Sequence, residues 1–186
     1  MTIGFAMCGS FCTFDQVFPI MEELASNYTL IPIFSDITYT TDTRFGTHQT
    51  HIDHAEKICG HQVLYTIPQV EPIGPKKLLD ALIIAPCTGN TLAKLAHSIA
   101  DTSVTMAAKS HLRNARPVII AVSTNDALAG AAENIGKLLS RKNYFFVPFA
   151  QDNPSAKPTS MVADFHLISE TLKASLEGKQ ITPIIL

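Results

Sequence analysis

The sequence predicts an α/β fold, a Rossmann-like doubly wound parallel sheet in three α/β/α layers, formed by a single domain. Short apolar runs alternate along the chain with segments of helical periodicity, which is the pattern of parallel strands joined by crossover helices. Residues 82–85 and 118–122 are almost purely apolar, as expected of central strands covered on both faces. The length of 186 residues suits one domain, so we expect its bounds to be 1–186.

The elements follow from the spacing of apolar residues and from the positions of proline and glycine. We predict strands at 3–7, 28–34, 64–66, 82–85, 118–122 and 144–148. We predict helices at 13–26, in part of 41–60, and at 90–96, 103–112, 128–140 and 162–177. Residues 66–75 hold three prolines and one glycine and are predicted to be a loop, as is the polar segment 151–158.

The amino-acid composition limits the kinds of partner that this protein is expected to bind. Hydrophobic residues make up 46% of the chain and charged residues 16%, which is enough apolar material for one sizeable core. The low charged fraction predicts that some apolar surface is buried in an oligomer or against a partner. The net charge of −2, with no basic stripe, does not favour a nucleic-acid partner. The N-terminus MTIGFAMCGS has no positive segment of a signal peptide, and no apolar stretch is long enough to cross a membrane. We therefore expect a cytoplasmic protein that does not associate with membranes.

The cysteines do not form a recognisable framework. Cys8 and Cys12 lie four residues apart across a predicted strand-to-helix turn, and no second pair completes a zinc site or a set of disulfides. We interpret them as buried reduced thiols and expect no metal.

The histidines cluster in one predicted helix. His48, His51 and His54 are spaced so that they lie roughly along one helical face. The favoured interpretation is a solvent-facing or interface surface, with an active-site or subunit contact and a metal site as the alternatives. His97 and His111 are expected on helix surfaces.

Small polar residues follow four of the predicted strands. In a doubly wound sheet, ligands bind beyond the carboxyl ends of the strands. Gly9 and Ser10, at the start of a helix, predict a phosphate site, with a plain strand-to-helix turn as the alternative. The amide of Asn90 can both donate and accept, which suits the edge of a heteroaromatic ring, although helix capping is an alternative role. The segments concerned are 9–11, 35–36, 86–91 and 123–126.

The stretch PCTGNTLAKLAHSIADTSVTMAAKSHLRNARPVIIAV, residues 86–122, resembles the signature of the homo-oligomeric flavin-containing cysteine decarboxylases and their relatives. That signature is Pro-Ala-Ser-Ala-Asn-Thr after a buried strand, followed by a helix and an Ala-Asp pair. The proline-cysteine start and the RPVIIAV strand also resemble the flavin prenyltransferases. The resemblance extends over nearly the whole chain, and the residues that match the signature are Pro86, Asn90, Thr91, Ala93, Lys94, Ile99, Ala100 and Asp101.

The resemblance implies FMN binding and a homo-oligomer built from trimers, with the flavin between subunits. It places Lys157, in a polar loop, where a lysine could meet a substrate carboxylate; a solvated loop lysine is the alternative. The residues that it places around the phosphate and ribityl chain are Gly9, Ser10, Phe11 and Ser35. Those that it places along the flavin ring are Pro86, Thr88, Asn90 and Thr91, with Ser123 and Asn125 approaching from the next strand end.

The departures from the signature bear on the reaction. The decarboxylases carry a catalytic histidine about 14 residues before the signature proline, and here that position is Pro72, which cannot transfer a proton. Their Pro-x-Met-Asn segment is replaced by Val122, Ser123, Thr124 and Asn125, and the Arg-Glu pair of the prenyltransferases is also missing from this loop. Neither cysteine decarboxylation nor prenyl transfer is therefore supported.

Within the family, the resemblance implies a flavoprotein-type subunit that helps to oxidise a dihydro or tetrahydro precursor to a pyridine dicarboxylate in spore-forming bacteria. It implies a separate nicotinamide-dependent, dehydrogenase-like subunit, so that NAD(P) enters only through that partner. A flavin can accept the hydride that such an aromatisation releases. The alternatives are an FMN-dependent decarboxylase or prenyltransferase-like enzyme, and a non-catalytic binding subunit that has lost the flavin.

Overall fold

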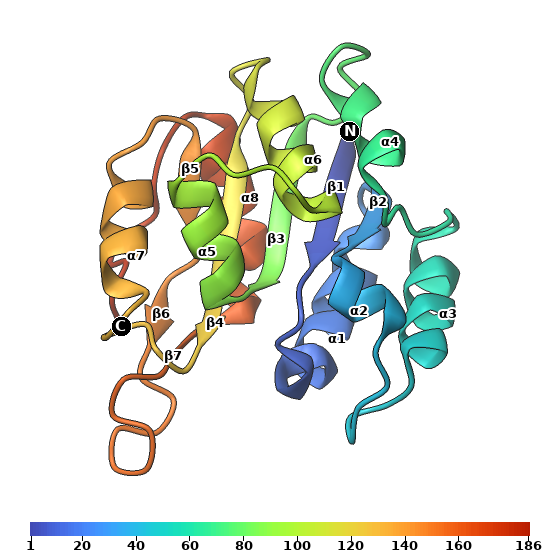
Figure 1. Cartoon of the computed structure of the whole chain (residues 1–186). Coiled ribbons are helices and arrows are strands. Elements are labelled where there is room, and N and C mark those ends of the chain that lie inside the picture. The colour runs from blue at the N-terminus through green and yellow to red at the C-terminus, as the bar shows by residue number, and fades with distance from the viewer.

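A seven-stranded sheet runs through the centre of the computed structural model, which describes all residues, 1–186 (Figure 1). Four parallel strands lie in the order β2-β1-β3-β4, and β5 continues the parallel sheet alongside the first half of β4. The second half of β4 pairs with β7, which is antiparallel and pairs with β6. The strands are β1 (Thr2–Met7), β2 (Thr29–Phe34), β3 (Ala81–Cys87), β4 (Val118–Thr124), β5 (Tyr144–Phe146), β6 (Phe149–Ala150) and β7 (Met161–Ala163).

Helices cover both faces of the sheet, which confirms the predicted three-layer α/β/α fold. Helices α1 and α8 pack on one face, whereas α5, α6 and α7 lie on the other, and α3 packs beside α1 and β2 (Figure 1). No helix has the length and apolar character needed to cross a membrane. The helices are α1 (Phe14–Ala25), α2 (Asp36–Thr40), α3 (His48–Cys59), α4 (Ile67–Val70), α5 (Gly89–Ala96), α6 (Ser103–Leu112), α7 (Ala132–Leu139) and α8 (Ile168–Leu176), with 3-10 turns η1 (Phe11–Thr13), η2 (Glu71–Ile73) and η3 (Phe165–Leu167).

The central strands are buried because both of their faces meet helices. All seven residues of β3 are buried, as are the first six of β4, and Ile83 pairs with Ile119 across the two strands. Because their sequences are apolar without interruption, these strands can pack against the helices on both faces of the sheet. Rigid strands therefore position the loops that follow them.

The order of the parallel strands, β2-β1-β3-β4-β5, reverses direction between β1 and β3. The chain leaves β1 toward one side of the sheet and leaves β3 toward the other, so the loops after these two strands separate and leave a crevice at the carboxyl edge. This switch point is where ligands bind in open α/β sheets.

Several predicted elements differ from the structure. The helix predicted at 162–177 begins only at Ile168, because residues 161–163 form β7, in which Met161 and Val162 pair with the end of β4. The helix predicted at 128–140 begins at Ala132, after a turn. The predicted loop 66–75 contains α4 and η2, whereas the strand predicted at 64–66 is reduced to a single bridge between Ile33 and Leu64.

The prediction that His111 lies on a helix surface was wrong. Its side chain is completely buried, and Nε2 lies 3.1 Å from the carbonyl oxygen of Pro117, the residue before β4. Nδ1 has no hydrogen-bond partner. Desolvation by burial lowers the pKa of His111 to about 4.

Candidate functional site

A cleft of about 650 Å³ lies at the carboxyl edge of the sheet, at the switch point between β1 and β3. The loops after β1, β3 and β4 form most of its lining, and two further loops complete it. It is lined by residues 9–12, 43–45, 88–90 and 123–126, together with Asp152, Lys157, Ser160 and Val162. Of the residues predicted from the sequence, it brings together Gly9, Ser10, Phe11, Thr88, Asn90, Ser123, Asn125 and Lys157.

The loop after β1 presents free backbone donors to the cleft. The N–H groups of Gly9, Phe11 and Cys12 make no hydrogen bond within the chain, whereas that of Ser10 bonds to the carbonyl of Cys8 at 2.8 Å. These donors lie at the start of η1 and α1, where the helix dipole also favours an anion. The Ser10 hydroxyl donates to the carbonyl oxygen of Ser123 at 2.7 Å, which ties this loop to the end of β4.

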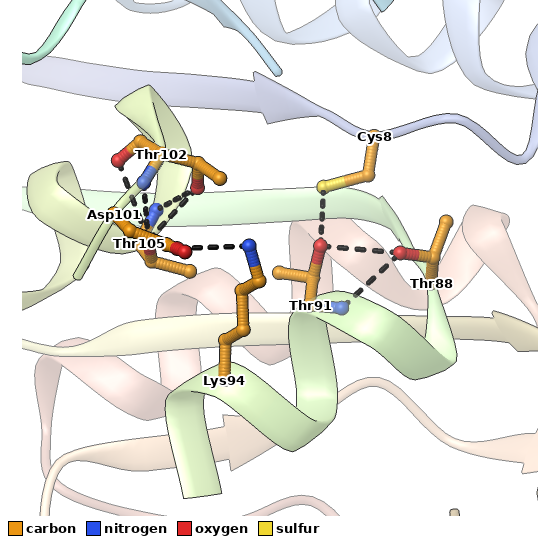
Figure 2. Close-up of polar contacts among 7 residues, drawn as sticks. All are labelled: Cys8, Thr88, Thr91, Lys94, Asp101, Thr102 and Thr105. Atoms are coloured by element: carbon orange, nitrogen blue, oxygen red, sulfur yellow. Dashed lines mark hydrogen bonds and ion pairs between the residues drawn. The ribbon is translucent and has the colours of Figure 1, made fainter. Parts of the chain in front are cut away.

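The loop after β3 is held in place by a chain of hydroxyl groups (Figure 2). Thr88 caps α5, since its side chain accepts the N–H of Thr91 at 3.3 Å. The Thr88 hydroxyl donates to the Thr91 hydroxyl at 3.1 Å, and Thr91 donates in turn to the sulfur of Cys8 at 3.3 Å. This chain joins the start of α5 to the end of β1, so the two sides of the switch point are held together.

The loop after β4 approaches α5 closely. The Thr124 hydroxyl donates to Oδ1 of Asp126 at 2.5 Å. A Cβ atom on Gly89 would lie 2.7 Å from the Thr124 hydroxyl and 2.8 Å from Asp126 Oδ1. A glycine at position 89, where the family signature has alanine, therefore makes room for the Asp126 carboxylate beside the N-terminus of α5.

Three predicted site residues do not line the cleft. The Ser35 side chain is 8% exposed and shares a hydrogen bond of 2.9 Å with Thr38. Thr91 is turned inward to Cys8, as described above. Pro86 is buried within β3, where its carbonyl oxygen accepts the N–H of Cys8 at 3.2 Å.

The sequence interpretation missed several lining residues. Thr43, Arg44 and Phe45 come from the loop between α2 and α3, and Asp152 and Ser160 come from the long loop between β6 and β7. Lys157 pairs with Asp152 at 3.1 Å. For residues 43–45, the one indication in the sequence was an arginine within a short polar stretch.

Two charged residues of the family signature, Lys94 and Asp101, do not line the cleft. Lys94 on α5 pairs with Asp101 at 2.8 Å, and this hydrogen bond holds the pKa of the Asp101 carboxyl below its usual value. Asp101 precedes Thr102, which caps α6 and shares a 2.8 Å hydrogen bond with Thr105 (Figure 2). These residues therefore fix the connection between α5 and α6.

The thiols differ in exposure. Burial raises the pKa of Cys8 to about 11 and that of Cys87 well above its usual value, so both remain protonated at neutral pH. The prediction that Cys12 is buried was wrong, because it is exposed and lines the cleft. It lies in the first turn after β1, whose backbone faces the crevice.

The three histidines of α3 have separate surroundings. His48 pairs with Asp42 at 2.7 Å, and His54 stacks on Phe18 with ring centroids 4.2 Å apart. His51 is 6% exposed and packs edge-on against Phe14 at 4.9 Å. They do not share a metal site, and no group of three or more potential ligands gathers elsewhere in the structure.

Comparison with known proteins places the whole chain among related proteins. The family model described as Flavoprotein matches residues 1–175. A dipicolinate synthase subunit of Bacillus subtilis (strain 168) is 43% identical over 184 residues, which cover 98% of this chain and 92% of the relative.

Solved structures of other proteins share the fold of this chain. The crystal structure of a dipicolinate synthase subunit from Bacillus halodurans C matches with a TM-score of 0.91 at 40% identity, covering 100% of this chain and 95% of that chain. The FMN-dependent cysteine decarboxylase SpaF matches with a TM-score of 0.69 at 20% identity, over 94% of this chain and 97% of that chain. Together with the switch-point cleft, these matches show that the chain belongs to the Flavoprotein family.

Proposed function

We propose that this chain is the flavoprotein-type subunit of a dipicolinate synthase, which takes part in oxidising a dihydro- or tetrahydrodipicolinate precursor to dipicolinate during sporulation. The Bacillus subtilis relative, a dipicolinate synthase subunit, is 43% identical, and the match covers 98% of this chain. The match also covers 92% of the relative, so it extends over nearly the full length of both proteins.

The observation that supports flavin binding best is the set of free N–H groups at the switch point. Those of Gly9, Phe11 and Cys12 lack an acceptor in the chain, and a phosphate group can satisfy all three at a helix N-terminus. FMN carries such a phosphate. Burkholderia xenovorans DmrB, whose structure is described as a complex with FMN, has the same fold with a TM-score of 0.63 at 17% identity over 78% of this chain and 86% of that chain.

The remaining walls suit the ring of a flavin. The exposed amide of Asn90 is free to donate and accept along a heteroaromatic edge. Phe11 supplies an apolar face in the same cleft, and the loop at Ser123 and Asn125 bounds the other side. When bound, a flavin supplies a hydride acceptor. We infer that these side chains orient the ring and exclude water from it.

A second polypeptide completes the proposed enzyme. The relative is named as a subunit, and we propose that the partner of this chain is a nicotinamide-dependent subunit that binds NAD(P). Lys157 faces the cleft while paired with Asp152 at 3.1 Å. A substrate carboxylate can replace Asp152 in this pair, since an exposed ion pair is weak.

Flavin binding is tested by titrating FMN into the purified protein and following its absorbance and fluorescence. Asn90→Ala should weaken binding by about 0.5–1.5 kcal/mol, or roughly two- to tenfold in Kd, through loss of one polar contact. Asn27→Ala removes an exposed amide at the end of α1 and serves as the matched control. A wild-type protein that binds no FMN would support the alternative of a non-catalytic subunit.

The reaction class is tested by two assays of the intact protein. With cysteine-containing substrates we expect no release of CO₂ from this chain alone, because Pro72 cannot transfer a proton. With a tetrahydrodipicolinate precursor, we expect dipicolinate only when the nicotinamide-dependent partner is also present. Dipicolinate formation by the partner at the same rate with and without this chain would contradict the proposal.

A further inference from the structure

We propose that Arg44 binds a carboxylate of the substrate and so selects a ring dicarboxylic acid for the switch-point cleft. The inference rests on the proposed function for the identity of that acid, a dihydro- or tetrahydropyridine dicarboxylate whose oxidised product is pyridine-2,6-dicarboxylate. It assigns a role to a loop residue outside the family signature.

The turn that carries Arg44 is firmly held. Thr43 and Gly46 exchange two backbone hydrogen bonds, of 3.0 and 3.2 Å. Asp42 accepts both the backbone N–H of His48, at 2.9 Å, and its ring Nδ1 at 2.7 Å, which anchors the turn to the start of α3. Gly46 has a φ of +135°, a conformation that favours glycine. Arg44 is therefore presented at the tip of a constrained turn.

The turn reaches past the carboxyl edge of the sheet. In Figure 1 the segment between α2 and α3 extends below the sheet on one side, and the loop between β6 and β7 extends below it on the other. Arg44 from the first loop and Lys157 from the second both line the cleft. A ligand that enters from this edge meets a cation from either side.

Arg44 is the one charged residue of the cleft without a polar partner. Of the four charged side chains in the lining, Asp152 and Lys157 pair with each other at 3.1 Å. Asp126 accepts the Thr124 hydroxyl at 2.5 Å beside the N-terminus of α5, where a negative charge is favourable. Arg44 makes no hydrogen bond and no ion pair, and its guanidinium lies 4.8 Å from the centre of the Phe45 ring. The cleft therefore holds one guanidinium whose N–H donors have no acceptor within the chain.

The surroundings of Arg44 favour a ring carboxylate over a phosphate. A guanidinium binds either group through two parallel hydrogen bonds. A flavin phosphate already has the free N–H groups of Gly9, Phe11 and Cys12. Arg44, in contrast, stands beside Phe45, which is 45% exposed, and Phe11 lines the same cleft. Apolar faces next to a guanidinium suit a flat ring whose carboxylate points at the arginine.

The experiment compares acids and flavins on the same variants. Pyridine-2,6-dicarboxylate and pyridine-2-carboxylate are titrated calorimetrically, in metal-free buffer, into wild-type protein, Arg44→Gln and Arg44→Lys. We expect Arg44→Gln to weaken dicarboxylate binding by about tenfold or more, and Arg44→Lys to restore only part of it, because lysine lacks the two-pronged geometry. Arg113→Gln, an exposed arginine at the end of α6, is the matched control and should bind as wild type does.

Flavin titrations separate this inference from the proposed function. FMN and riboflavin should each bind Arg44→Gln as they bind wild type, and the exposed position of Arg44 predicts an unchanged melting temperature. A variant that loses affinity for FMN but not for riboflavin, with dicarboxylate binding intact, would overturn the inference and assign Arg44 to the phosphate. Unchanged dicarboxylate affinity, or none in wild type, would overturn it too. Arginine-dependent dicarboxylate binding in a protein that takes up no flavin would support it while contradicting the flavin proposal.

Discussion

Gly89 shows how a single missing methyl group shapes the site. Gly89→Ala would place a Cβ atom 2.7 Å from the Thr124 hydroxyl and 2.8 Å from Asp126 Oδ1, so the loop after β4 must move. We expect a loss of about 1–3 kcal/mol in the free energy of unfolding, as for other overpacked sites, together with weaker flavin binding. Urea unfolding measures the first effect, and FMN titration the second.

Gly136→Ala is the control for that substitution. A Cβ atom there meets nothing within 4 Å on α7, so we expect stabilisation by about 0.4–1 kcal/mol, because the unfolded chain loses freedom. Combining Gly89→Ala with Asp126→Ala should recover part of the lost stability. Equal stabilities for Gly89→Ala and the wild type would show that the loop tolerates the methyl group.

His111 predicts a pH dependence of stability. Its pKa is about 4 in the folded protein, against 6.5 for a free histidine, so the folded state excludes a proton that the unfolded state accepts. The stabilisation is present above pH 6.5 and is lost as pH falls from 6.5 toward 4. Between pH 7 and pH 5 the wild type should lose about 2 kcal/mol more than His111→Gln, measured by urea unfolding at both values.

An exposed histidine provides the comparison. His97→Gln, at the end of α5, replaces an exposed histidine and serves as the matched control substitution. A His111→Gln variant whose stability falls with acid as steeply as that of the wild type would contradict the assignment.

At the scale of elements, α5 connects the switch point to the rest of the fold. Its N-terminus lines the cleft, and its last carbonyl groups, those of Leu95 and Ala96, accept hydrogen bonds of 3.1 and 2.7 Å from the guanidinium of Arg141. Arg141→Gln should cost about 1–2 kcal/mol of stability, because the carbonyl of Ala96 has no other donor, whereas that of Leu95 also accepts the N–H of Ser98 at 3.1 Å. Lys142→Gln, its exposed neighbour, should change the free energy of unfolding by less than about 0.5 kcal/mol. Equal effects of the two substitutions would contradict the role of Arg141 in capping the C-terminus of α5.

The elements that could be predicted from the sequence are those with local signals. The strands β1, β3 and β4 and the helices α1, α5 and α6 lie within about two residues of their predicted bounds, because apolar runs and helical periodicity are properties of the segment itself. Strand β7 forms by pairing with the end of β4, a long-range partner, so Val162 and Ala163 were assigned to a helix. Pro68 suggested a loop but lies in the first turn of α4, where proline is tolerated.

The features of the site, like the elements of the fold, fall into those that local sequence predicts and those that it does not. The loops after β1, β3 and β4 could be placed together because parallel strands end at one edge of the sheet. The direction of each side chain could not be predicted, and Ser35 and Thr91 turn into the protein toward Thr38 and Cys8. The Arg44 turn escaped prediction because its position depends on the contacts of Asp42 and Gly46 with α3, which no local pattern encodes.

At the scale of the whole molecule, the surface combines few charged residues with several exposed large hydrophobic side chains. Charged residues are 16% of the chain. Large hydrophobic side chains that are at least 36% exposed occur on several elements: Ile37, Phe45, Ile67, Leu78, Ile99, Leu128, Leu139 and Leu176. Exposed side chains of this kind are stabilised when a partner subunit covers them.

We therefore predict a homo-oligomer built from trimers. The trimer is the building block that the family resemblance of the sequence implies. This prediction rests on the exposed surface and not on the cleft, so it holds whether or not a flavin is bound. Light scattering at micromolar concentration should give a mass that is a multiple of three times the 20.2 kDa of one chain, and its persistence on dilution would reflect the apolar area buried. A mass of one chain across the micromolar range would overturn the prediction and would leave the exposed side chains to be covered by the proposed partner subunit instead.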